Sequence, residues 1–165
     1  MPFRRGVFLL SAALIVWASG ATGAGAQSAP LCEHAREFLV DDFAMLAEVE
    51  PETIADARTA QVHSGCRITA AGGTALTLTE TAALLYEQLG ATGWTRTPDP
   101  RDVPARGVRR MRSEGVDCLF AVYKAVTETI GTGAQLRVNR AFHPLDQDEM
   151  FNVIVQCVPP LAAVK

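Results

Sequence analysis

Residues 108–126 read VRRMRSEGVDCLFAVYKAV, and they decide the class of fold that the chain adopts. Two β-compatible runs, 108–114 and 116–126, stand on either side of Gly115. Glycine readily takes the backbone angles of a tight turn, so the stretch predicts a β-hairpin. Strands joined by so short a turn run antiparallel. The other strands of the sheet are expected before and after this hairpin in the sequence.

One of these strands is expected before the hairpin and two after it. From residue 61 to residue 70, apolar and polar residues alternate with a period of two, which is typical of a half-buried strand. Residues 135–142 are also compatible with a strand. The polar loop 143–149 leads into a last strand over 150–158, where alternate residues are apolar.

Two helices are expected beside these strands. Residues 31–49 carry apolar side chains at helical spacing, and Pro51 marks the end because proline disfavours helical geometry in the residue before it. Thr77 and Glu80 have capping-box spacing, an apolar stripe follows them, and Gly90 suits the position just past a helix end. This pattern is typical of an α+β domain. We predict a mostly antiparallel sheet of four to five strands with two main helices packed on one side.

The N-terminus carries the pattern of a secretory signal peptide. Two arginines precede an apolar stretch over 7–18, and the small residues at 24–26 form an A-x-A cleavage site. The apolar stretch is shorter than the roughly 20 residues that a membrane-spanning helix needs. We therefore predict that residues 1–26 are removed near Ala26. Residues 27–165 are then one exported domain, periplasmic or secreted, without a membrane span.

Composition and the cysteines support this domain organisation. The 165 residues are 48% hydrophobic and 20% charged, which fits one compact domain and excludes a disordered chain. An even number of cysteines in an exported domain predicts disulfides. Three pairings are open, and we favour the one that ties each half of the chain to itself. It joins Cys32 to Cys66 and Cys118 to Cys157. C-x-x-C spacing and paired Cys/His spacing are both missing, so we predict no metal site and no cofactor.

The most distinctive candidate for ligand binding is the basic run 106–112. It contains Arg109, Arg110 and Arg112, and guanidinium groups bind carboxylate, phosphate or sulfate through paired hydrogen bonds. On a strand, Arg110 and Arg112 share one face and Arg109 takes the other. These side chains suit an anionic component of the cell envelope or an acidic partner. The alternative, which we favour, is local pairing with acids, namely Asp99, Asp102, Glu114 and Asp117.

Catalytic signatures are missing from the sequence. It lacks the G-x-S-x-G motif of hydrolases and the glycine-rich loops that bind nucleotides. A net charge of −3 argues against a nucleic-acid-binding protein. We therefore expect a non-catalytic binding or interaction module of the cell envelope, whose partner is an anionic envelope component or another envelope protein. The alternative is a small exported hydrolase assembled around His143 and the acidic loop 146–149.

Overall fold

The structure is a computed structural model that describes residues 25–103, 107–125 and 132–160. It confirms an α+β fold, with a six-stranded antiparallel sheet in the order β1-β2-β6-β5-β4-β3. The predicted signal peptide lies almost entirely outside the described residues. The elements are α1 Gly25–Glu37, the π-helical turn η1 Phe38–Asp42, β1 Leu46–Asp56, β2 Gln61–Thr74, α2 Leu78–Ala91, β3 Thr95–Arg96, β4 Val108–Ser113, β5 Val116–Lys124, α3 Gly133–Ala141 and β6 Glu149–Val158.

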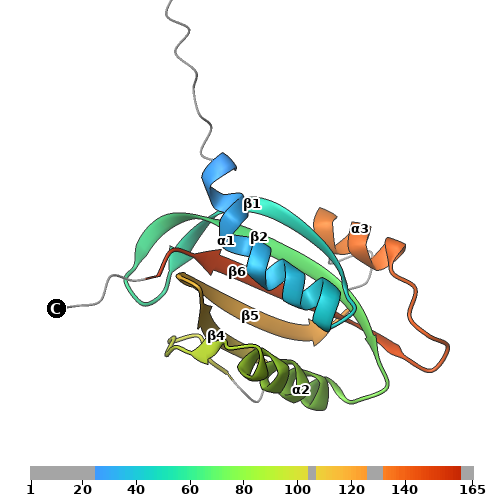
Figure 1. The fold of residues 1–165 in the computed structure, drawn as a ribbon. Coiled ribbons are helices and arrows are strands. Elements are labelled where there is room, and N and C mark those ends of the chain that lie inside the picture. Colours follow the sequence, from blue (N-terminus) through green and yellow to red (C-terminus); the bar gives the residue numbers. More distant parts are fainter. Residues whose placement is uncertain (1–24, 104–106, 126–131, 161–165) are drawn as a thin grey trace, which may run out of the picture.

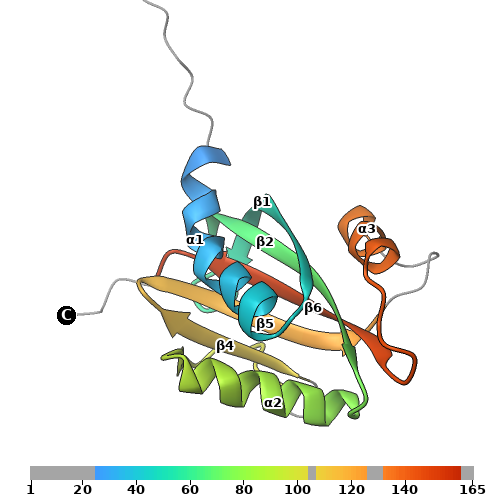
Figure 2. The same cartoon turned by 45° about the vertical axis from the view of Figure 1, so that its right-hand side comes forward.

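Helices cover both faces of the sheet (Figures 1 and 2). As predicted, two helices, α1 and α2, pack on one face, and the main hydrophobic core lies beneath them. Helix α3 packs on the opposite face, against β1 and β2. Residues at the centre of the core include Leu39, Leu85, Phe120 and Val153, all fully buried. Trp94 meets the ring of Phe120 edge-on at 5.4 Å and closes the core at the end of α2.

The predicted hairpin is present as β4 and β5. Glu114 and Gly115 form its turn with φ values of 46° and 79°, and two successive positive φ values are what a two-residue hairpin turn requires. β6 then pairs antiparallel with both β5 and β2 and so becomes a central strand. The helix predicted after Thr77 is also confirmed, with both hydrogen bonds of the capping box in place.

The prediction of one helix over 31–49 is wrong in its second half. The helix ends in η1, Ala44 reverses the chain with a φ of 51°, and residues from 46 onward form β1. β1 pairs with β2 over its whole length, and this pairing outweighs the helical spacing of its apolar residues. β1 is an edge strand, and Pro51 is tolerated there because it needs no partner on the open side.

The strand predicted over 135–142 is also wrong, because this segment is helix α3. Thr132 and Gln135 form a capping box, and the side-chain amide of Gln135 donates to the Tyr123 hydroxyl at 2.8 Å. Asn139 exchanges hydrogen bonds with Asn152 of β6. These contacts fix α3 on the sheet. The sheet therefore has six strands instead of four to five, since β1 and the short β3 join it and 135–142 does not.

Candidate functional site

A groove lies where β2 leads into α2, and we call it the α2 groove. It consists of two adjoining hollows of about 520 and 250 Å³, which share Thr74 and Phe151. Leu76 and Leu78 line the larger hollow and Leu84 lines the smaller one. These leucines are 45%, 37% and 38% exposed, whereas Phe151 is buried and forms the floor. The groove therefore offers apolar surface to a ligand.

The walls of the α2 groove are held by local hydrogen bonds. The Thr74 hydroxyl accepts a bond from the backbone N–H of Leu76 and also bonds the Thr81 hydroxyl at 3.1 Å. The capping box then fixes the start of α2. At Gly72, a Cβ atom would lie 2.8 Å from the Phe151 ring, so glycine lets this ring lie against β2. These bonds fix the backbone of the segment that carries Leu76 and Leu78.

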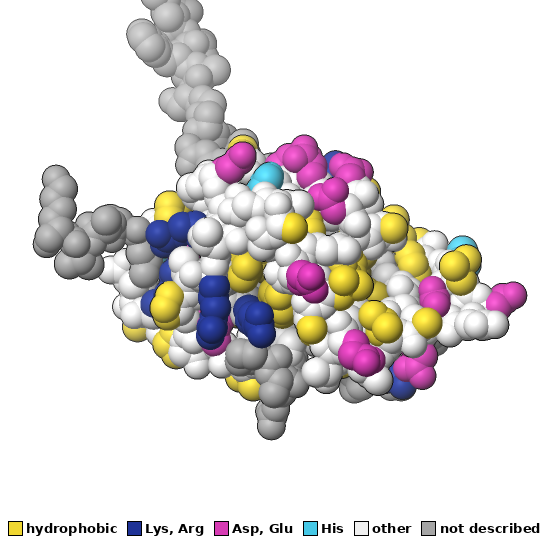
Figure 3. Space-filling model, turned by 60° about the horizontal axis from the view of Figure 1, so that its bottom comes forward, with side chains coloured by type: hydrophobic (Ala, Val, Ile, Leu, Met, Phe, Trp, Pro, Cys, Tyr) yellow, Lys and Arg dark blue, Asp and Glu magenta, His cyan; other side chains and the backbone are white. Residues whose placement is uncertain are grey.

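The border of the α2 groove is acidic. Asp42 and Glu149 line it, and Glu80 and Glu87 stand one turn either side of Leu84 on the exposed side of α2. Figure 3 shows carboxylates among apolar side chains on the right half of this view, with most arginines and lysines on the left. Among the described residues that line the groove, the only cation is Lys124, which pairs with Glu149 at 3.4 Å.

The arginines singled out in the sequence lie away from the α2 groove, on β4. Arg110 is fully buried, and its Nε donates to Asp99 at 2.6 Å. Arg112 makes two bonds with Asp117, at 2.8 and 2.9 Å. Local pairing with acids, the alternative given for these two arginines, is therefore what the structure has. Arg109 points to the other face of the sheet, as predicted, where its guanidinium lies 4.8 Å from the centre of the Tyr86 ring.

The buried aspartates and their arginine partners form what we call the ionic cluster, which consists of Asp56, Asp99, Asp117, Arg58, Arg101, Arg110 and Arg112. Its member Arg58 was not singled out from the sequence. Arg58, in the turn between β1 and β2, binds Asp56 at 2.6 Å and Asp117 at 2.8 Å. It links the end of the β1–β2 hairpin to β5. The signal that could have found it is the spacing D-x-R, which occurs twice in the cluster. In Asp56–Arg58 and in Asp99–Arg101, the carboxylate accepts bonds from the arginine backbone N–H and from its Nε.

Ion pairing lowers the pKa of the buried aspartates in this cluster. The side-chain hydrogen bond from Arg58 holds the pKa of Asp56 well below its usual range. At Asp117, burial opposes ionisation, but bonds from Arg112 and Arg58 outweigh it and lower the pKa. Asp99 behaves in the same way, since bonds from its arginine partners outweigh the effect of burial. The cluster is therefore fully ionised at neutral pH.

Acid is expected to destabilise the protein through these aspartates. Because each folded pKa lies below the unfolded value of about 3.9, the cluster stabilises the fold above that pH and loses this contribution as the pH falls through the folded values. We expect the free energy of unfolding, from urea titrations, to fall steadily from about pH 4 to about pH 2. Arg58→Met should flatten this dependence, whereas Asp42→Asn at an exposed carboxylate should not. Equal acid sensitivity of Arg58→Met and the parent would refute the assignment.

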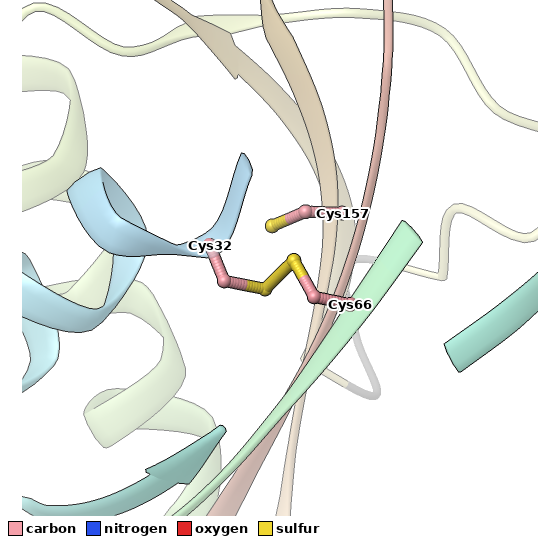
Figure 4. A group of neighbouring side chains, drawn as sticks. All are labelled: Cys32, Cys66 and Cys157. Carbon is pink, nitrogen blue, oxygen red and sulfur yellow. A yellow bond between two sulfur atoms is a disulfide. The ribbon is translucent and has the colours of Figure 1, made fainter. Parts of the chain in front are cut away.

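Both predicted disulfides are present. Cys32–Cys66 joins α1 to β2 and Cys118–Cys157 joins β5 to β6, and all four residues are buried. The sulfur atoms of Cys32, Cys66 and Cys157 lie within 4.8 Å of one another (Figure 4). Metals bind cysteine as the thiolate, whereas these sulfur atoms are all in S–S bonds. The cluster is therefore a covalent link between α1 and the central strands.

The residues of the hydrolase alternative lie in the loop before β6. His143 and Asp146 are both exposed there. Within the described parts of the chain, no hydrogen bond or ion pair joins His143 to a carboxylate.

Comparison of the chain with known protein families, with curated proteins and with solved structures finds no match. In the described part of the chain, no helix is long and apolar enough to cross a membrane. The two disulfides are compatible with an exported protein.

Proposed function

We propose that the protein is a non-catalytic binding module of the cell envelope and that its α2 groove takes a short apolar segment of a partner protein carrying lysine or arginine side chains. The observation that carries this proposal is the set of exposed leucines around a hollow of about 520 Å³. Specific ligand sites have volumes of about 300–1,000 Å³ and are mainly apolar with a few polar groups. The predicted signal peptide and the disulfides support export as the setting.

The charge of the partner follows from the border of the groove. Asp42 lines the groove without a cation beside it in the described part of the lining, Glu149 lines it paired with Lys124, and two exposed glutamates of α2 stand near Leu84, so acids outnumber bases here. A cationic segment gains from this arrangement, because complementary charge speeds association and fixes orientation. The arginines of β4 favour an anionic partner less, since Arg110 is fully buried with its Nε on Asp99 and the fork of Arg112 is bonded to Asp117. A basic, apolar segment therefore fits the surface better than an anionic one.

Binding of two matched peptides tests this function. The probes are a fluorescent nine-residue peptide of leucine, phenylalanine and lysine, and the same peptide with glutamate in place of lysine. We expect the lysine peptide to bind the processed protein saturably, more weakly at high salt, and the glutamate peptide to bind at least tenfold less tightly. Fluorescence anisotropy measures both affinities at two salt concentrations.

Variants of exposed leucines locate the binding surface. Leu76→Ser and Leu84→Ser, on two walls of the α2 groove, should each weaken the lysine peptide about tenfold, or about 1.4 kcal/mol. Val62→Ser is the matched control, because Val62 is an exposed apolar residue of β2 outside the groove. An affinity lowered equally by Val62→Ser, or equal binding of the two peptides, would disprove the proposed function.

A further inference from the structure

Cys157 is directly opposite a cysteine on each of its two neighbouring strands. In the strand register it is opposite Cys66 of β2 on one side and opposite Cys118 of β5 on the other. It is bonded to Cys118, with a Cα–Cα distance of 4.1 Å. A bond to Cys66 would join the same kind of position across the other strand boundary. The sheet thus places Cys157 where either partner is within reach.

The sulfur atoms are also close enough for exchange. The Cys157 sulfur lies within 4.8 Å of both sulfurs of the Cys32–Cys66 bond and beside that bond (Figure 4). A thiolate held beside a disulfide reacts as an intramolecular nucleophile, at a far higher effective concentration than a thiol in solution. All four cysteines are buried, so an external dithiol reaches either bond only during local opening of the fold, whereas Cys157 is already beside Cys32–Cys66.

We propose that Cys157 is a thiol-exchange residue and that the protein has a second covalent form. A dithiol reductant first opens Cys118–Cys157 and is itself oxidised to a disulfide, leaving two protein thiols. The Cys157 thiolate then attacks the Cys66 sulfur, the Cys66–Cys157 bond forms and the Cys32–Cys66 bond breaks. Cys32 leaves as a thiolate and takes up a proton, so the exchange itself consumes no oxidant or reductant.

The second form differs from the first in how α1 is held. Cys32–Cys66 is the covalent link between α1 and the sheet, and exchange replaces it with a link between β2 and β6. Helix α1 then stays on the sheet through packing alone, for example by Ala35 and Leu39. Cys32 is fully buried while α1 packs on the sheet, so its free thiol can form a mixed disulfide with another molecule only when α1 detaches. This reactivity is independent of ligand binding in the α2 groove.

Two variants, each with one cysteine replaced by serine, test the exchange. Cys118→Ser leaves Cys157 as the one free thiol, next to the Cys32–Cys66 bond. After incubation at pH 8, acid quenching, alkylation and peptide mapping, we expect both isomers, within about tenfold of each other, one with Cys157 alkylated and one with Cys32 alkylated. Cys157→Ser is the matched control, since its free thiol at Cys118 is not the register partner of Cys66. It should keep Cys32–Cys66 and show alkylation at Cys118 only.

Partial reduction of the unaltered protein gives a second readout that needs no variant to fold. With less than one equivalent of dithiothreitol, exchange predicts molecules alkylated at Cys32 and Cys118 and joined through Cys66–Cys157. Without exchange, the alkylated pairs are only Cys118 with Cys157 or Cys32 with Cys66. Failure to detect the Cys66–Cys157 peptide in this experiment would overturn the proposal and would leave the groove function standing.

Discussion

Reduction of both disulfides is expected to unfold most of the protein at 37 °C. The bonds span 34 and 39 residues, and each stabilises the fold by about 4 kcal/mol in the chain-entropy model. A whole domain has a net stability of only about 5–15 kcal/mol. Losing both bonds therefore removes a large share of it. Urea titrations followed by near-UV circular dichroism, with and without a phosphine reductant, measure the loss.

Pairwise variants separate the two bonds. Cys118→Ala with Cys157→Ala, and Cys32→Ala with Cys66→Ala, should each lower the free energy of unfolding by about 2–4 kcal/mol. The second pair should also shift hydrogen exchange in α1, because this bond is its covalent link to β2. A reduced protein with the unfolding midpoint of the oxidised one would show that packing alone stabilises the fold.

The elements that could be predicted from sequence carry their own local signals. Helix α2 begins with a capping box at Thr77, and the β4–β5 turn contains Gly115 at a positive φ. In β2, apolar and polar residues alternate over 61–70, and in β6 every second residue from Phe151 to Cys157 is apolar. Sequence left three disulfide pairings open, and the favoured one, in which each bond closes a loop within one half of the chain, is the one present.

The errors lie where partners distant in the chain decide the structure. β1 has helical spacing in part of its sequence, and its pairing with β2 overrides this local preference. The residues of α3 are also compatible with a strand, and this led to the wrong prediction. The capping-box spacing of Thr132 and Gln135 could have predicted the helix. The α2 groove combines β2, β6, η1 and α2, so no contiguous stretch of sequence describes it.

The ionic cluster shows the same limit for site residues. Pairing of Arg110 and Arg112 with nearby acids could be predicted from sequence, because these residues are close in the chain. Arg58 lies far from β4 in the chain and still shares Asp117 with Arg112. A guanidinium that is buried with carboxylate partners stabilises the fold. It is not accessible to a ligand.

Arg110→Met is expected to lower the free energy of unfolding by about 3–5 kcal/mol, because it removes one partner of a fully buried ion pair. Arg110 and the side chain of Asp99 have no exposed surface, and their bond is 2.6 Å long. After the substitution, Asp99 keeps only the partly exposed Arg101 as an ionic partner among the described residues. Methionine retains much of the volume, so the loss reports the missing ionic partner of the buried carboxylate. Urea unfolding at pH 7 measures it.

Two further variants distinguish loss of charge pairing from loss of packing. Arg96→Met breaks a pair with Asp102 in which the arginine is 58% exposed, and should cost less than about 1 kcal/mol. Adding Asp99→Asn to Arg110→Met should restore part of the lost stability, because the buried side chain that has lost Arg110 is then neutral. If instead the double variant is less stable than Arg110→Met by the full cost of Asp99→Asn alone, the two side chains act independently and the ion pair is not what Arg110 contributes.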